Sequence, residues 1–399
     1  MNLLIAILGL AALIFVHELG HFLVARAVGM SPRKFYIGFP PPLVRVRRKG
    51  IEYGIGTIPL GGYVKLPGMH RPAPSDLDLH LGRAAEERPA VARRVEEVKA
   101  RLAEGDMAGA AAALPALEEE VGGRPLSDAA ARAADRGLNE LRDGLGADAY
   151  WRQRTWKKVA VIFAGPGANL VVALALFSVL LIQDAWQIGV RLQASPENAV
   201  TTLVEEVLPG TPAEDAGIQA GDRIVAVDGR QLNAPQLLDA IAASEGRPLE
   251  LSLQRDTDAL VTVVAAERRG GLSPPAAVAR SAQITWRVTK QIALFFPRLA
   301  RGEGTNEVSS PVGIAQVSSE ALEQGFDDFL FVLGLISLSL ALLNLLPLLP
   351  LDGGHIAFSL IEGVRGRALG RQLYERVSMI GIAFVLVLFA LGLSNDIGG

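Results

Sequence analysis

Residues 17–21 read His-Glu-Leu-Gly-His. On a helix, His17 and His21 lie one turn apart on the same face, which suits two imidazole ligands of one zinc ion. Glu18 is then placed to act as general base toward a water on that ion. The surrounding segment Leu3–Val28 is apolar and long enough to cross a bilayer. Because ionisable side chains are costly at membrane depth and mark function there, the pattern predicts hydrolytic metal chemistry inside a membrane.

A third ligand must come from elsewhere, since a catalytic zinc usually takes three protein ligands and leaves one position open. The chain has five histidines and no cysteine, so histidines and carboxylates are the available donors. The apolar segment Phe329–Leu349 runs into LNLLPLLPLDGGH, which ends at His355. Its prolines remove backbone donors and its paired glycines allow a sharp turn, so the helix breaks here. Broken backbone at membrane depth lines a cavity or is buried in protein, which makes Asp352 and His355 the candidates.

Between these two candidates, ligand chemistry favours Asp352, because a carboxylate completes two-histidine sites in metallopeptidases. An Asp before Gly is also common as an N-cap or turn residue, and this alternative stays open. Asn344, a lone amide in a span, is a candidate to orient a ligand or the substrate backbone, or else makes an interhelical hydrogen bond. His70 and His80 fall in a polar segment, and we expect them to be solvated surface residues.

The composition is that of a membrane protein with large aqueous parts. Half of the 399 residues are hydrophobic and the mean hydropathy is +0.30. The net charge of −3 predicts no nucleic-acid partner, and the absence of cysteine excludes a disulfide framework and a thiolate zinc site. The first apolar segment lacks the basic start of a secretory signal, so we expect a retained span. Segments long enough to cross a bilayer are Leu3–Val28, Val159–Ile182, Phe329–Leu349 and Val377–Leu393.

Charged flanks predict the orientation of these spans. Basic side chains are frequent after the first span, before the second, and between the third and fourth, whereas the opposite flanks carry aspartates such as Asp184, Asp327, Asp328 and Asp396. Cytoplasmic loops carry the excess of Lys and Arg. Both termini are therefore predicted outside the cytoplasm, with residues 29–158 and 350–376 inside it.

The first cytoplasmic connection has two parts. Gly50–Leu66 is rich in glycine, with β-branched and aromatic residues in rough alternation, and predicts a hairpin or looped sheet. Residues 83–150 are rich in Ala, Glu and Arg with helical periodicity, broken at Gly105 and at Gly122-Gly123. We expect two or three solvated amphipathic helices there. A charged helical hairpin is favoured over a regulatory or partner-binding role.

The external segment 183–328 contains a soluble domain at about 200–268. A further stretch, Ile284–Leu299, is amphipathic, with aromatic residues among arginines and a lysine. It lies either on the membrane surface or over the catalytic core. Within the soluble domain we expect short strands at Val204–Val207, Ile224–Val227 and Leu249–Gln254, and helices at Pro212–Ala216 and Leu237–Ala243.

These motifs resemble the site-2 protease family of intramembrane zinc metalloproteases. That family pairs H-E-x-x-H in its first core span with N-x-x-P-x-x-x-L-D-G in its third, matched here by Asn344, Pro347, Leu351, Asp352 and Gly353. Further matches are IPLGGYVK at 58–65, AGPGANL at 164–170 and PVGIA at 311–315. The segment PGTPAEDAGIQAGDRIVAVDG at 209–229 resembles a PDZ domain. This order is typical of the bacterial regulator-of-sigma-E protease branch.

The resemblance implies roles for the site residues. His17, His21 and Asp352 would bind zinc, with Asp352 rather than His355 as the third ligand. Glu18 would be the catalytic base, and Asn344 is the substrate-positioning candidate. The β-like loop at 50–66 would unwind a helical substrate by pairing with it as an added strand.

The chain also departs from the family pattern. Gly38-Phe39-Pro40 stands where relatives usually have Gly-Phe-Gly. We find one PDZ domain, whereas the best-known branch member carries two. The helical insertion at 70–150 has no counterpart in the family pattern.

We therefore predict a multi-pass α-helical membrane protein with four transmembrane helices, an extracytoplasmic β-rich PDZ domain and a cytoplasmic helical insertion, in a bacterial plasma (inner) membrane. The predicted divisions are 1–69 (first span and β-like loop), 70–150 (insertion), 151–183 (second span), 198–270 (PDZ domain), 271–328 (extracytoplasmic linker with an amphipathic helix) and 329–399 (third and fourth spans).

The predicted function is an intramembrane Zn²⁺ metalloprotease that cleaves single-span membrane proteins in regulated intramembrane proteolysis. Expected substrates are anti-sigma-factor-like proteins or remnant signal peptides, and expected partners include the lipid bilayer and a peptide C-terminus at the PDZ domain. Two alternatives come from other classes. A non-proteolytic PDZ-containing membrane scaffold would not need Glu18, and a zinc transporter would show several metal sites along a path.

Overall fold

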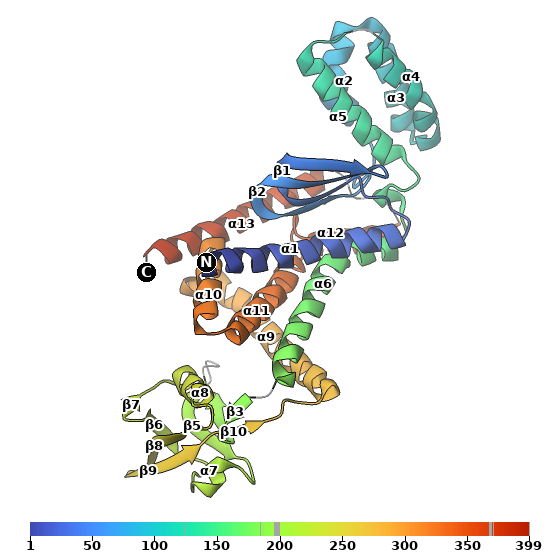
Figure 1. Ribbon diagram of the computed structural model, residues 1–399. Coiled ribbons are helices and arrows are strands. Elements are labelled where there is room, and N and C mark those ends of the chain that lie inside the picture. Colours follow the sequence, from blue (N-terminus) through green and yellow to red (C-terminus); the bar gives the residue numbers. More distant parts are fainter. Residues whose placement is uncertain (124, 184, 195–199, 367–368, 370, 399) are drawn as a thin grey trace. The chain divides into compact units, whose positions relative to one another are not determined.

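The computed structural model describes residues 1–399 except 124, 184, 195–199, 367–368, 370 and 399 (Figure 1). The chain divides into two compact units. Unit 1 comprises Met1–Leu176 and Ile284–Gly399, and unit 2 comprises Phe177–Gln283.

The apolar segments predicted as spans are helical. Among the described residues, the helices long and apolar enough to cross a membrane are α1 (Asn2–Ala27), α6 (Thr155–Ile182), α11 (Phe326–Asn344) and, within α13 (Arg371–Gly398), the stretch Leu373–Asp396. The third span was predicted to end at Leu349, but its helix ends at Asn344. The reason is that the chain turns through residues 345–351, where two prolines cannot donate backbone hydrogen bonds.

Helices α1, α11 and α10 (Pro311–Gln324) share an apolar core. It is built around Ala6 and Leu13 of α1 and Phe329 and Leu333 of α11. The backbones approach closely at Gly9, where an added Cβ would lie 3.0 Å from the Phe329 ring. Helix α10 begins at the PVGIA motif and was not predicted as a helix. A short 3-10 turn, η2 (Thr305–Glu307), precedes it, and α12 (Asp352–Arg365) follows α11.

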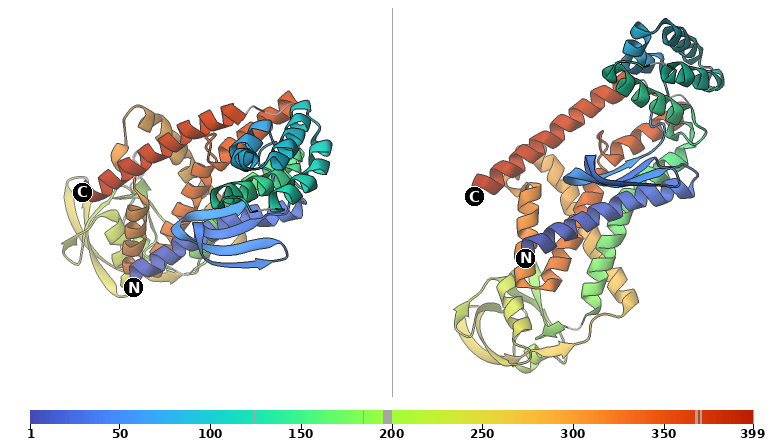
Figure 2. Two further views of the ribbon diagram at one scale, coloured as in Figure 1. Left: turned by 90° about the horizontal axis from the view of Figure 1, so that it is seen from above. Right: turned by 45° about the horizontal axis from the view of Figure 1, so that its top comes forward.

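The predicted loop at 50–66 is part of a larger sheet, formed by β1 (Lys34–Arg48) and β2 (Ile51–Lys65) and lying along α1 (Figures 1 and 2). Residues 34–37 pair with 52–55 on one side and with 62–65 on the other, and 44–48 pair with 51–55. Residues 62–65 therefore form one edge of this sheet. The departure at Gly38-Phe39-Pro40 falls within β1, and the side chains of Phe39 and Pro40 lie outside the described part of the structure.

The insertion forms a bundle of α2 (Pro74–Glu87), α3 (Pro89–Glu104), α4 (Met107–Gly122) and α5 (Asp128–Leu145). With residue 124 outside the described part, three of these helices, α3, α4 and α5, lie within residues 83–150, in agreement with the prediction of two or three helices there. The predicted breaks are correct, since α3 ends at Gly105 with φ +78° and α4 ends at Gly122. Helix α2 lies mostly before residue 83 and was not predicted. The bundle has its own core, which includes Leu77, Val98, Leu117 and Leu138. The turn η1 (Tyr150–Arg152) leads on to α6.

Unit 2 is a β-rich domain that covers more than the predicted 200–268. Its main sheet has the order β4 (Val190–Ala194), β5 (Val200–Val207), β6 (Arg223–Val227), β8 (Pro248–Arg255) and β9 (Asp258–Ala265), with β7 (Arg230–Gln231) paired to β6. A second pair joins β3 (Ala185–Gln187) to β10 (Glu267–Arg269). The predicted helices are present as α7 (Pro212–Asp215) and α8 (Ala234–Ala243). The predicted domain start at 198 falls among residues outside the described part.

Two further features are an ion pair in unit 2 and the amphipathic helix that follows its last strand. Arg255 donates from Nε to Asp222 Oδ1 at 2.7 Å, and this hydrogen bond holds the pKa of the buried Asp222 carboxyl below its usual range. The amphipathic stretch at Ile284–Leu299 is the second half of α9 (Pro274–Ala300), and its Trp286 side chain is exposed.

Candidate metal centre

Three side chains from two distant segments converge on one point in unit 1. His17 Nε2 lies 3.2 Å from His21 Nε2 and 3.2 Å from Asp352 Oδ2, and His21 Nε2 lies 3.4 Å from the same carboxylate oxygen. A tetrahedral zinc ion with bonds of about 2.0–2.1 Å places its ligand atoms roughly 3.3–3.4 Å apart. The three atoms therefore have the mutual spacing of three corners of a zinc tetrahedron.

The polar atoms of this cluster also indicate that a cation binds between them. Among the described residues, Asp352 Oδ2 is buried and has no hydrogen-bond partner of adequate geometry. A buried carboxylate oxygen without a partner costs free energy, and two imidazole lone pairs facing it would repel it. A metal ion at the centre removes both penalties. The donor set and its geometry thus fit zinc.

The break after α11 is what brings Asp352 to the histidines. Gly353 and Gly354 are packed so tightly that a Cβ on the first would overlap the Leu345 backbone and a Cβ on the second would overlap the Leu349 backbone. The chain can therefore fold back directly after the prolines and start α12 at Asp352.

Helix α6 passes directly beside the two histidines. A Cβ on Gly165 would overlap His21 Nε2 and would lie 2.8 Å from His17 Nε2. On the facing helix, a Cβ on Gly20 would overlap the carbonyl of Ala164. This close approach explains Gly165 of the AGPGANL segment, because a larger residue there would occupy the space where the imidazoles meet.

Helix α6 also sets the orientation of the imidazole rings. His21 Nδ1 lies 2.8 Å from the carbonyl oxygen of Val161, so Nδ1 carries the proton and donates it. The Nε2 lone pair of His21 is then free to face the ion.

Asn169, also on α6, is the corresponding neighbour of His17. It is fully buried, and its amide lies 3.3 Å from His17 Nδ1, while its Oδ1 has no partner among the described residues. The amide oxygen and nitrogen exchange places by a half-turn. With the oxygen toward His17, the Nδ1–H donates to it and the Nε2 lone pair faces the ion, as at His21. Sequence reasoning missed this residue, although the AGPGANL match places an asparagine within a span.

The centre opens into a cavity of about 710 Å³. Glu18 and Asn344 line it together with the three converging residues, as does the edge strand 62–65. Gly62 packs against the Glu18 side chain so closely that a Cβ there would overlap it. The predicted catalytic residue, the predicted substrate-positioning residue and the candidate ligands thus share one cavity.

The remaining histidines lie farther out in this cavity. His355 is not part of the converging trio, and its ring faces Tyr374 with centroids 6.5 Å apart. The His70 ring lies against the same tyrosine, at 4.9 Å. His80 is mostly buried, with 18% of its side chain exposed, and contacts Glu140. The expectation of a solvated surface residue was wrong for His80, which packs between α2 and α5, whereas His70 is exposed as expected; both line the cavity.

The chain is similar to known proteins over nearly all of its length. A relative from Brucella suis biovar 1 is 29% identical, with 97% of this chain and 93% of the relative covered. Zinc metalloprotease RasP of Geobacillus kaustophilus is 27% identical, with 97% and 95% covered. Among solved structures, the PDZ domain of HtrA3 bound to a phage-derived ligand matches 22% of this chain and 91% of its own length, at 32% identity and a TM-score of 0.19.

The family match extends over nearly all of the chain. The model of peptidase family M50 matches residues 5–388, which include the H-E-x-x-H helix, the glycine-containing part of α6 and the start of α12. The chain therefore belongs to peptidase family M50, the site-2 protease family of intramembrane zinc metalloproteases.

Proposed function

We propose that the chain cleaves single-span membrane proteins, with His17, His21 and Asp352 as zinc ligands and Glu18 as the general base. The observation that carries this proposal is the convergence of three ligand atoms at 3.2–3.4 Å, one of them a buried carboxylate oxygen with no hydrogen-bond partner among the described residues. Glu18 stands in the same cavity, one residue from the first ligand.

Each residue of the centre has a defined task in peptide hydrolysis. Zinc bound there would supply Lewis acidity, polarising the scissile carbonyl and acidifying a water. Glu18 accepts the proton of the attacking water and passes it to the leaving amine. Val161 and Asn169 hold the two imidazoles with their Nε2 lone pairs toward the centre. Asn344, at the end of α11, positions the substrate backbone from the wall of the cavity.

A helical substrate must be unwound before its peptide bonds can react. The edge strand 62–65 offers a row of backbone groups beside Glu18, and an extended segment can add to it as a further strand. Gly62 is required here, because a side chain would collide with Glu18. The strand therefore supports a role in holding the scissile bond straight and close to the base.

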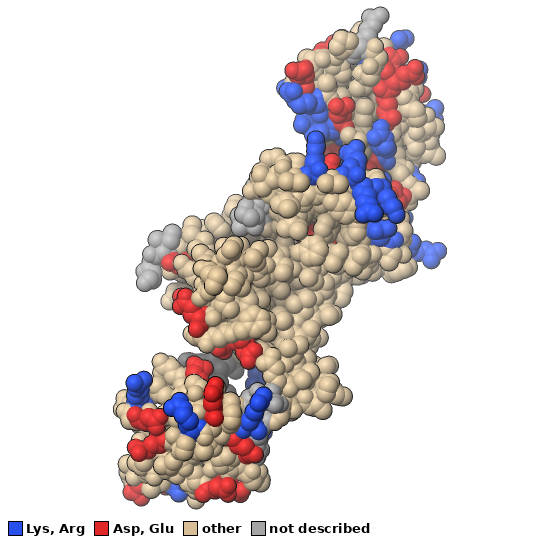
Figure 3. Space-filling model, viewed as in Figure 1, with Lys and Arg blue, Asp and Glu red and all other residues tan. Residues whose placement is uncertain are grey.

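The distribution of charge supports the orientation in the membrane. In Figure 3 the part of unit 1 that holds the apolar helices shows few charges, while lysines and arginines gather over the sheet and the adjoining bundle. By the positive-inside rule, that end faces the cytoplasm and both termini lie outside it, in a bacterial plasma membrane. Single-span substrates of the anti-sigma-factor or remnant-signal-peptide kind would expose their spans to this centre.

The β-rich domain of unit 2 would act on the substrate from the external side. Its PDZ assignment rests on the sequence motif at 209–229. The buried Asp222–Arg255 pair supports the loop that follows this motif's short helix, since Asp222 also accepts the backbone N–H of Gln219 at 2.8 Å. A domain of this kind would bind a peptide C-terminus or exclude substrates with large external parts.

The proposal is tested by cleavage of a single-span reporter in proteoliposomes that contain the full-length enzyme. We expect cleavage that a zinc chelator abolishes and added zinc restores. The Glu18→Gln variant should bind one zinc per chain and lose at least about a hundredfold in cleavage rate. Cleavage by Glu18→Gln at the unmodified rate would overturn the assignment of the base, and chelator-resistant cleavage would overturn the metal mechanism.

A further inference from the structure

The helical bundle takes no part in the zinc chemistry, yet two of its helices line the same cavity. Asp76 and His80 of α2 and Glu140 and Asp143 of α5 all face this space, as do the metal centre and the edge strand. The bundle therefore forms one wall of the cavity into which the metal centre opens.

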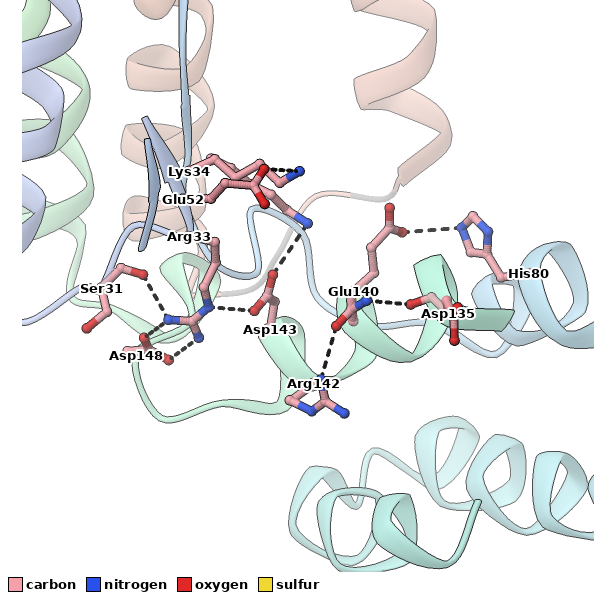
Figure 4. A network of polar contacts seen from close by, with 12 residues as sticks. Ser31, Arg33, Lys34, Glu52, His80, Asp135, Glu140, Arg142, Asp143 and Asp148 are labelled. Atoms are coloured by element: carbon pink, nitrogen blue, oxygen red, sulfur yellow. Dashed lines mark hydrogen bonds and ion pairs between the residues drawn. The ribbon is translucent and has the colours of Figure 1, made fainter. Parts of the chain in front are cut away.

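Ion pairs fasten this wall to the sheet (Figure 4). Arg33, directly before β1, donates from Nε to Asp143 at 2.7 Å and from Nη1 to Asp148 at 2.9 Å. Lys65, at the end of the edge strand, lies 3.5 Å from Asp143. Asp143 thus bridges the residues at which the sheet begins and ends.

Close backbone packing adds to these ion pairs. A Cβ on Gly68 would lie 2.8 Å from the Asp143 carbonyl oxygen, and Gly68 has φ +54°, which favours glycine. A Cβ on Gly144 would lie 2.5 Å from the Pro72 ring. The end of α5 therefore packs directly against the segment that follows the edge strand. This packing fixes the positions of the α5 side chains relative to the edge strand.

The wall carries an excess of negative charge. Asp143 is neutralised by Arg33 and Lys65, whereas Glu140 pairs with His80, at 3.2 Å, and His80 is charged only when protonated. The Glu140 side chain is 58% exposed, so it can meet a ligand in the cavity. Tyr63 of the edge strand lines the same cavity; burial raises its pKa, and the nearby Glu140 and Asp143 carboxylates raise it further.

A substrate strand on the edge 62–65 would run from Glu18 toward this wall. Gly62 touches Glu18, and Lys65 reaches Asp143, so the strand itself connects the base with the bundle. At about 3.3 Å per residue, the span from 62 to 65 corresponds to roughly 10 Å. A substrate residue on the order of three to five positions from the scissile bond would therefore lie level with Lys65 and Asp143, about one helical turn along α5 from Glu140.

We propose that α2 and α5 form a specificity wall that selects substrates with a lysine or arginine three to five residues to the cytoplasmic side of the cleaved bond, with Glu140 as the residue that meets it. This inference rests on the proposed function and on its membrane orientation. Membrane proteins carry Lys and Arg on their cytoplasmic flanks, so the wall would favour a span that is correctly inserted and cut near its cytoplasmic end.

The test is a matched set of single-span reporters that carry Lys, Gln or Glu at each of positions two to six on the cytoplasmic side of the cut. The full-length enzyme in proteoliposomes should cleave the best-placed Lys reporter about five- to tenfold faster than its Glu counterpart, measured as kcat/KM. This difference corresponds to one attractive contact replaced by a repulsive one in a half-exposed site. Glu140→Lys should reverse the preference.

Glu119→Lys, which places the same charge change on the exposed face of α4, is the matched control and should keep the preference of the unmodified enzyme. Zinc content and melting temperature identify a variant that fails to fold, and in that case Glu140→Gln, which should abolish the preference, replaces it. An unchanged order of reporters in a folded Glu140 variant overturns the specificity wall. Absence of chelator-sensitive cleavage of every reporter overturns the proposed function instead.

Discussion

The metal centre and the helical bundle are two regions of the same unit built in opposite ways. The centre draws on α1, α6, the end of α11 and the start of α12, and it depends on a few polar atoms and on glycines that let backbones meet. The bundle is one continuous stretch with its own apolar core, and its contacts join neighbouring helices. A change of a few atoms should therefore abolish zinc binding at the centre, whereas a single substitution should only partly destabilise the bundle. The following predictions test this difference.

The largest effect is expected from removal of the third ligand. Asp352→Ala leaves two imidazoles to hold the ion, and stoichiometric zinc should be lost together with all chelator-sensitive cleavage. Metal analysis of the purified protein measures this directly. His355→Ala is the matched control, because His355 lies in the same cavity outside the trio and should keep one zinc per chain. Stoichiometric zinc in Asp352→Ala, with loss in His355→Ala, would transfer the ligand role to His355.

The next prediction compares the effect of one added methyl group in each of the two regions. Gly165→Ala places a Cβ where the two imidazoles meet, and we expect zinc binding to be lost and stability to fall by about 1–3 kcal/mol, because a packed centre resists added volume. Gly82→Ala in α2 of the bundle, where a Cβ meets nothing within 4 Å, should instead stabilise the bundle by about 0.5–1 kcal/mol.

Gly167→Ala is a nearer control, since its Cβ would meet the Phe163 ring at 3.2 Å and no metal ligand. Zinc content and thermal unfolding report on all three variants. Full zinc binding by Gly165→Ala would mean that α6 can move away from the histidines. The packing of α6 against the centre would then not be required for zinc binding.

A smaller effect is expected at Asn169, which contacts the candidate ligand His17 and would influence a bound ion only through it. Asn169→Ala removes the acceptor for the imidazole Nδ1–H, and zinc affinity should fall about 10- to 100-fold. Asn169→Asp keeps an acceptor oxygen and should retain most of the affinity. A purely structural role predicts the reverse order, because a buried carboxylate disrupts packing more than alanine does. Competition with a zinc chelator of known affinity separates these outcomes.

The same contrast explains what could be predicted from sequence. The spans, the H-E-x-x-H helix and the proline-glycine break are local patterns, and the residues they single out are the ones the structure brings together. Asn169 and Val161 could not be assigned, since their role depends on how α6 lies against α1.

The sheet and the bundle show where local patterns fail. Residues 34–37 pair with both 52–55 and 62–65, and residues 44–48 pair with 51–55, an arrangement that hydrophobic alternation cannot specify. Helix α2 lies mostly before the predicted helical region, and its Leu77 and Leu81 are buried only through contacts within the bundle. The cavity position of His80 depends on its contact with α5. In each case the missing information is a contact between segments.

The smallest effect on the centre is expected from damage to the core of the bundle. Leu117 is fully buried, and Leu117→Ala should destabilise the bundle by about 2–5 kcal/mol. Leu79→Ala, at a leucine whose side chain is 67% exposed on α2, should change it by about 0.5 kcal/mol or less. Hydrogen exchange over 74–145 measures the stability, and metal analysis follows the centre.

Zinc should stay at one per chain in both leucine variants, because the candidate ligands and the residues that orient them all lie outside the described part of the bundle. Faster exchange confined to the bundle of Leu117→Ala would support two regions that fail independently. Loss of zinc from Leu117→Ala would show instead that Arg33 and Asp143 transmit the stability of the bundle to the sheet and on to α1, and the two regions would then be one cooperative unit.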